Sequence, residues 1–281
     1  MSHDVEALFL VHLLHWLLVL PLGLLGYHAI AVFGGQVVSR ADRGVRAPFD
    51  RQMTALLLRE SVARSLTSLL GLIGWIRGRP GLPKRFPDDP VPVLFVSGVH
   101  RSRASLWFMQ LFVRQRGYTH TRCVGHSHAD RTLAELAAEL GNEVMRFKAE
   151  TDAERIHIVG HSAGALVAAW WVRHLDGAEH VQRLVCIGGP FAGTRMAVFG
   201  RSKASGQLLP RSPTLDDLAP CPVSTTCIWS PDDPVVVPAE SAILPGAESV
   251  RIDGSGHVDL LFSSRCCRAV MAALGAAGES R

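Results

Sequence analysis

From Val91 onward the sequence alternates short apolar runs with longer segments of helical character. Most of the runs are continuous and contain β-branched residues, which is typical of strands buried on both faces. Strands separated by helices form βαβ units, and these build a mostly parallel sheet covered by helices on both sides. We therefore predict an α/β fold with about six strands, at 93–96, 118–124, 156–160, 184–187, 224–229 and 249–252, and helices at 103–116, 133–147, 163–175 and 260–274.

Composition narrows the class of protein further. A chain of 281 residues, 48% of them hydrophobic, can bury a sizeable core without a disulfide or a metal ion. The net charge of +4 is too small and too scattered to indicate a nucleic-acid partner. The six cysteines include no CxxC pair and no zinc spacing, so we expect no metal site and a reducing compartment.

The first 39 residues differ sharply from the rest, because Ala7 to Ser39 contains no Asp, Glu, Lys or Arg. Its most apolar part, Leu8 to Phe33, measures about 39 Å as a helix and exceeds the ~30 Å hydrocarbon core of a bilayer. A cleavable signal peptide would have a basic start and a shorter apolar stretch. We predict a retained N-terminal transmembrane helix in 1–39, with a buried core helix as the alternative.

Arginines follow this predicted span but do not precede it. Arg40, Arg43, Arg46 and Arg51 lie on its C-terminal side, whereas the only charged residues on the N-terminal side are acidic. Positive residues remain in the cytoplasm, so the sequence predicts a single-pass membrane protein with its main domain cytoplasmic.

Residues 40–90 are predicted to connect this anchor to a catalytic domain at 91–281. After a basic connector, 53–76 has helical periodicity, and 77–90 is a linker rich in proline. Arg59, Glu60 and Arg64 lie off the apolar stripe of this helix. The stripe could lie on a membrane surface or pack on the main domain, and it consists of Leu58, Val62, Leu66, Leu69, Ile73 and Ile76.

The pentapeptide Gly160-His161-Ser162-Ala163-Gly164 matches the pattern GxSxG. It directly follows an apolar strand-like run and directly precedes a helix of small residues, which is the setting of a nucleophile elbow. The alternative is a tight turn with an incidental serine. The context favours Ser162 as a nucleophile.

A serine hydroxyl needs a general base, and that base needs a carboxylate that orients it. Asp232 and Asp233 follow the predicted strand at 224–229, and His257 follows the last strand within Gly254-Ser255-Gly256-His257. The order Ser, Asp, His is the order in which α/β-hydrolases carry their triad.

With these motifs, residues 91–275 resemble a small α/β-hydrolase of the lipase and esterase type. The resemblance implies Ser162 as nucleophile, His257 as base and Asp233 as acid, with Asp232 as the less favoured neighbour. It also implies an oxyanion hole formed by the backbone N–H groups of Val99 and Ala163.

Two further positions are interpreted through this resemblance. Asp259 is expected to cap the final helix. The turn Gly189 to Thr194 is similar to a glycine-rich turn of bacterial lipases, and either lines the substrate site or is a plain loop.

The expected function is hydrolysis of carboxylic esters, with lipid esters as substrates and no cofactor. The segment 191–220 is too short for a large cap domain, which favours a short lid or an open site. A membrane-associated acyltransferase or thioesterase is the alternative on the same scaffold. A non-catalytic membrane-bound binding protein is the alternative of another class.

Overall fold

The computed structural model describes residues 2–45, 49–76, 81–86, 88–98, 102–125, 130–200, 202–216 and 218–275. Within helices, the side chains of 2–18 and 72–76 lie outside this description.

A six-stranded sheet forms the centre of the molecule, and every strand pair in it is parallel. The predicted number of strands and their parallel arrangement are confirmed. β2 begins three residues later than predicted, and β4 begins three residues earlier. In spatial order the strands are β2 (Thr121–Val124), β1 (Val93–Val96), β3 (Ile156–His161), β4 (Val181–Ile187), β5 (Ser224–Trp229) and β6 (Glu248–Arg251).

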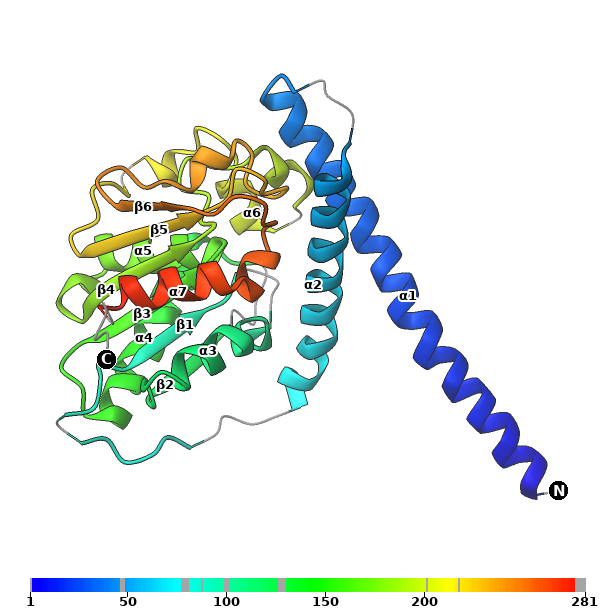
Figure 1. The fold of residues 1–281 in the computed structure, drawn as a ribbon. Coiled ribbons are helices and arrows are strands. Elements are labelled where there is room, and N and C mark those ends of the chain that lie inside the picture. Colours follow the sequence, from blue (N-terminus) through cyan, green and yellow to red (C-terminus); the bar gives the residue numbers. More distant parts are fainter. Residues whose placement is uncertain are drawn as a thin grey trace, which may run out of the picture.

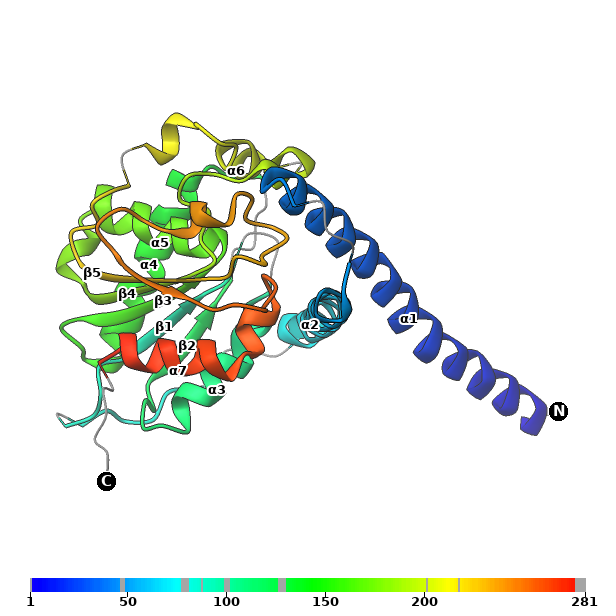
Figure 2. The same ribbon diagram turned by 45° about the horizontal axis from the view of Figure 1, so that its top comes forward.

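Helices cover both faces of the sheet (Figures 1 and 2). One face packs against α4 (Leu133–Thr151) and α5 (Ala163–His174), and the other against α3 (Trp107–Arg114) and α7 (Ser264–Ala273). Successive residues of a strand point to opposite faces, so the continuous apolar runs supply both cores. In β1, for example, Leu94 joins the first core and Phe95 the second.

Two predicted helices are each divided by a turn. Residues 103–116 form a 3-10 turn, Arg103–Leu106, followed by α3. Near the C-terminus a second 3-10 turn, Asp259–Phe262, precedes α7. Ser263 caps α7 by accepting a hydrogen bond from the Cys266 N–H, so the prediction that Asp259 caps this helix is wrong.

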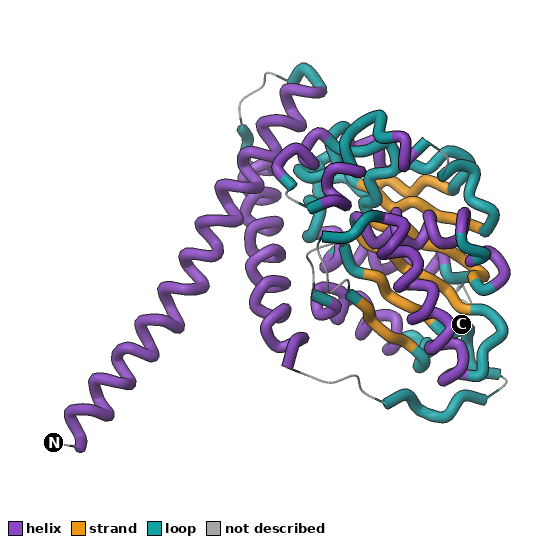
Figure 3. The backbone as a smooth tube through the Cα atoms, turned by 180° about the vertical axis from the view of Figure 1, so that it is seen from behind, coloured by secondary structure: helices purple, strands orange, loops and turns teal. Residues whose placement is uncertain are grey.

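The N-terminal segment forms a helical hairpin of α1 (Ser2–Asp42) and α2 (Arg51–Ile76). α1 continues unbroken through Pro21 and is about 60 Å long. Its N-terminal part extends away from the domain, whereas its C-terminal part lies beside α2 and the loops above the sheet (Figures 1 and 3). Within the described residues, one helix, over Val19–Asp42, is long and apolar enough to cross a membrane by length and composition.

The apolar stripe of α2 faces outward. Its members Leu58, Val62, Leu66 and Leu69 are 60%, 47%, 42% and 38% exposed. The opposite face is buried, and it carries Leu56, Glu60, Ala63 and Thr67. The alternative in which the stripe packs on the domain is therefore wrong for these four residues, because α2 docks through its more polar face.

Candidate active site

The three residues of the predicted triad follow three strands of the same sheet, with β4 lying between the first of them and the other two. Ser162 follows β3, Asp233 lies beyond β5, and His257 lies beyond β6. In a parallel sheet these carboxyl ends meet at one edge, which is where α/β proteins bind their ligands.

Ser162 lies on a sharp turn between β3 and α5. Its φ of 57° and ψ of −132° are strained for a residue with a side chain. Both flanking glycines are required by close approach. A Cβ at Gly160 would lie 2.6 Å from Ala165 Cα, and one at Gly164 would lie 2.4 Å from the Ser97 carbonyl oxygen. The turn therefore has the geometry of a nucleophile elbow.

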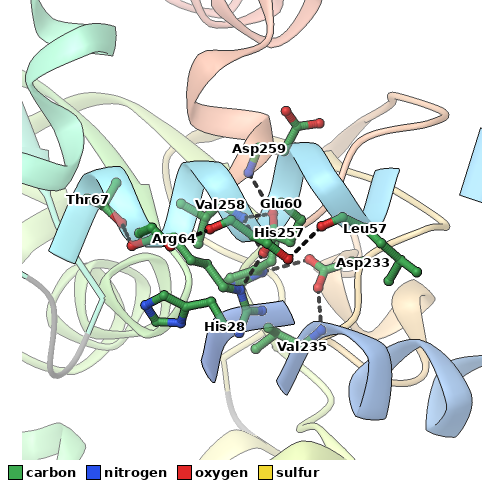
Figure 4. Close-up of polar contacts among 12 residues, drawn as sticks. His28, Leu57, Glu60, Arg64, Thr67, Asp233, Val235, His257, Val258 and Asp259 are labelled. Carbon is green, nitrogen blue, oxygen red and sulfur yellow. Dashed lines mark hydrogen bonds and ion pairs between the residues drawn. The ribbon is translucent and has the colours of Figure 1, made fainter. Parts of the chain in front are cut away.

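Asp233, and not Asp232, contacts the imidazole of His257. Asp233 Oδ2 accepts a hydrogen bond from His257 Nδ1 at 2.7 Å, and both side chains are buried (Figure 4). Asp233 Oδ1 accepts the N–H groups of Val235 and Val236 at 2.7 and 2.9 Å. Asp232 points elsewhere and accepts the Gly254 N–H at 2.8 Å.

This pairing sets the tautomer of His257. Because Nδ1 donates to a carboxylate, Nε2 keeps its lone pair and is able to accept a proton. No hydrogen bond joins His257 Nε2 to Ser162 Oγ among the described residues. Catalytic hydrogen bonds of this kind often tighten only when substrate binds.

The structure describes Ala163, one of the two predicted oxyanion donors, but not Val99. Ala163 is the first residue of α5, so its N–H has no acceptor within that helix. Val99 lies outside the described residues. Its neighbour Gly98 lies close to Ser162, since a Cβ at Gly98 would lie 3.1 Å from Ser162 Cβ. The loop after β1 therefore borders Ser162, as the resemblance implies.

Two further residues support the loops that carry Asp233 and His257. We call residues 230–238 the acid loop and residues 252–258 the base loop. His161 donates a hydrogen bond from Nε2 to the His257 carbonyl oxygen at 3.1 Å. Thr194 donates its hydroxyl to the Val235 carbonyl oxygen at 2.5 Å and accepts the Val237 N–H at 3.0 Å. Sequence analysis assigned no role to His161. The glycine-rich turn ending at Thr194 supports the acid loop, which neither of its two sequence interpretations anticipated.

Asp259 forms part of the surroundings of the base loop. Burial raises the pKa of its carboxyl above the ordinary value, and Arg59, 3.6 Å away, opposes that shift.

Between Phe191 and Pro220 the described residues form three short helices, Arg195–Phe199, α6 (Lys203–Gln207) and Pro213–Leu215. In the part of the chain that the structure describes, no group of three or more His, Cys, Asp or Glu residues is arranged to hold a metal ion.

The sheet order, the elbow and the three edge loops together define the α/β-hydrolase fold, and known structures agree. A lipase of Bacillus licheniformis in its mature form superposes with a TM-score of 0.58 at 15% identity, over 69% of this chain and 96% of that one. Lipase B of Aspergillus fumigatus gives 0.59 at 17% identity, over 69% and 55%. A bacterial membrane phospholipase A gives 0.51 at 14% identity, over 79% and 93%. No family model matches the sequence.

Proposed function

We propose that this protein is a membrane-anchored serine hydrolase that cleaves carboxylic esters, with lipid esters as its substrates. The 2.7 Å contact between His257 and Asp233 carries this proposal. This contact supports an oriented base at the same sheet edge as a serine held in the strained conformation of an elbow.

In the proposed reaction Ser162 Oγ attacks the ester carbonyl while His257 Nε2 takes the hydroxyl proton. The N–H groups of Ala163 and Val99 stabilise the negative charge on the carbonyl oxygen. The ester C–O bond then breaks, and His257 returns the proton to the leaving alcohol. A water molecule, activated by the same imidazole, releases the acid from the acyl-enzyme.

The hairpin supports a lipid substrate and a membrane location. Residues 8–27 of α1 measure about 30 Å as a helix, which matches the hydrocarbon core of a bilayer. Beyond them, His28 and Val32 are buried against protein, so the proposed span ends before the predicted Phe33. The similar membrane phospholipase A fits this assignment, and the exposed stripe of α2 would rest on the lipid surface.

We also propose that the domain lies on the cytoplasmic side, because the arginines follow the span and none precedes it. A fusion at Arg281 in a bacterial host tests this orientation. Fluorescence of a green fluorescent protein fusion is expected, whereas strong activity of a phosphatase fusion would contradict it.

The catalytic assignment is tested by labelling the full chain with a fluorophosphonate and by assaying a panel of acyl-chain esters. Ser162→Ala should abolish labelling and reduce kcat by about 10⁶-fold, as removal of a triad nucleophile does. Ser202→Ala, at the start of α6, is the matched control and should label normally. Labelling retained in Ser162→Ala would contradict the assignment, and an unaltered protein that neither labels nor turns over esters would favour the binding-protein alternative.

A further inference from the structure

Glu60 of α2 contacts the loop that carries His257. Its side chain is fully buried, and Oε2 accepts the backbone N–H groups of Val258 and Asp259 at 2.9 and 2.8 Å (Figure 4). Its other oxygen, Oε1, accepts a hydrogen bond from Arg64 Nε at 2.7 Å. A residue of the N-terminal hairpin thus bonds to the two residues that follow the proposed base.

The burial of this carboxylate is fully compensated. A buried ionised group is strongly destabilising unless it is paired and hydrogen-bonded. Glu60 meets both conditions, with two backbone donors and one arginine, and charge-assisted bonds of this kind are about twice as strong as neutral ones. The contact therefore requires a hydrogen-bond acceptor at this position of the helix, and the negative charge strengthens it.

The base loop is shaped to receive this side chain. A Cβ at Gly256 would lie 2.5 Å from Glu60 Oε2 and 2.9 Å from Glu60 Cβ. Gly254 has a φ of +71°, whereas Gly256 is not among the residues with positive φ. The first glycine thus suits the turn, and the second is required because α2 approaches so closely.

The contacts around His257 come from three directions. Asp233 binds the ring, His161 binds the carbonyl oxygen, and Glu60 binds the next two N–H groups. The loop itself contains no helix or strand between β6 and Asp259, so no ladder of backbone hydrogen bonds holds it.

The same hairpin contacts the acid loop. Gln36 of α1 is fully buried and donates from Nε2 to the Asp232 carbonyl oxygen at 2.6 Å. Gly35, one residue earlier, allows the helix to approach this loop, since a Cβ there would lie 2.3 Å from the Pro234 carbonyl oxygen. The hairpin therefore fixes the loops of both partners in the Asp233–His257 pair.

We propose that Glu60 is a positioning residue for His257, which holds the base loop where the imidazole contacts Asp233 and its Nε2 stays free to take the proton of Ser162. This inference rests on the proposed function. It makes the hairpin a part of the active site as well as an anchor.

Two substitutions of similar size separate positioning from packing. Glu60→Gln keeps an oxygen for the two N–H groups, whereas Glu60→Met fills the space without an acceptor. In the full chain, reconstituted in lipid, we expect Glu60→Met to lower kcat on a soluble short-chain ester by about 10- to 100-fold, the range for a catalytic group displaced by about 1 Å. KM should change less than about twofold, and Glu60→Gln should recover most of the loss. Rates are counted per site titrated with fluorophosphonate.

Ala63→Gly is the matched control, because it weakens the buried face of α2 without touching these hydrogen bonds. It should lower Tm and leave kcat per titrated site unchanged. Equal kcat in Glu60→Met and the unaltered protein would overturn the proposal. If Glu60→Met does not fold, Glu60→Asp decides, since it withdraws the carboxylate by about 1.5 Å, and unchanged kcat there has the same meaning.

Amide hydrogen exchange separates this proposal from the proposed function. Glu60→Met should increase exchange at Val258 and Asp259, and Ala63→Gly should not, whether or not any ester is turned over. Unchanged exchange in Glu60→Met would overturn the positioning role. Absence of ester turnover by the unaltered protein would instead overturn the proposed function.

Discussion

The α/β domain and the N-terminal hairpin place their apolar side chains in opposite ways. In the domain, large side chains such as Phe95 and Phe147 are fully buried. In the hairpin, Gln36 and Glu60 are fully buried, while Ile30 is 76% exposed. An extended apolar outer face is unusual for a surface in water and marks contact with a membrane or a partner.

The two regions are therefore stabilised differently. The domain folds around two apolar cores, whose stability scales with the area removed from water. The hairpin adds Ala63 to the second core, and it also meets the domain through hydrogen bonds and ion pairs, such as Gln36 to Asp232 and Asp42 to Arg195. Each such bond contributes modestly to stability but fixes orientation, because leaving either partner unpaired is costly.

The largest expected effect on kcat compares two neighbouring aspartates. Asp233 contacts His257 of the domain, whereas the backbone of Asp232 binds Gln36 of the hairpin. Asp233→Asn should lower kcat by about 10⁴-fold, because an amide favours the wrong tautomer of His257. Asp232→Asn, whose backbone oxygen binds Gln36, should lower kcat less than about tenfold. Steady-state kinetics on a soluble ester measure both, and the reverse ranking would show that Asp232 is the acid.

A smaller effect concerns the stability of the domain in acid. Burial, assisted by the charge of Arg183, lowers the pKa of His157 in β3 to about 4. The unfolded chain binds a proton at this residue below about pH 6.5, but the folded chain does so only near pH 4. The free energy of unfolding should therefore fall by about 3 kcal/mol as the pH drops through this window.

His157→Leu should remove this loss, and denaturant titrations at several pH values would measure it. The exposed His174 provides the control, since His174→Gln should leave the pH dependence unchanged. An equally steep decline in His157→Leu would assign the acid sensitivity to other groups.

The smallest expected effect is on kcat/KM, and it tests the exposed apolar stripe of α2. Leu58→Gln with Val62→Gln should lower kcat/KM on a vesicle-embedded lipid ester by about tenfold, because two half-exposed apolar side chains lose their contact with lipid. Turnover of a soluble ester should change less than about twofold. Met145→Gln with Leu175→Gln is the control, because these residues of α4 and the end of α5 are also exposed and apolar. Equal losses on both esters would contradict the lipid contact.

Local signals predicted the domain well. The run that becomes β3, followed by Gly160 and Gly164, sufficed to place Ser162 at an elbow. The same signals could not show the role of Glu60, because its partner Val258 lies 198 residues away and a charged residue off an apolar stripe resembles a solvated one. For α2, periodicity revealed an apolar face but not its surroundings. The sequence placed Gly256 in a loop, but only the structure shows that glycine is required there, because α2 approaches so closely.

The distance along the chain between Glu60 and Val258 also sets the order of events during synthesis. At 5–20 residues per second, the 198 residues between them take about 10–40 s to emerge from the ribosome. α1 and α2 are complete long before the base loop exists. The base loop is therefore among the last parts of the chain to be made, and it docks on a helical hairpin that is already complete. Under the proposed assignment, a newly made chain would complete its active site only after the hairpin that holds the base loop has been synthesised.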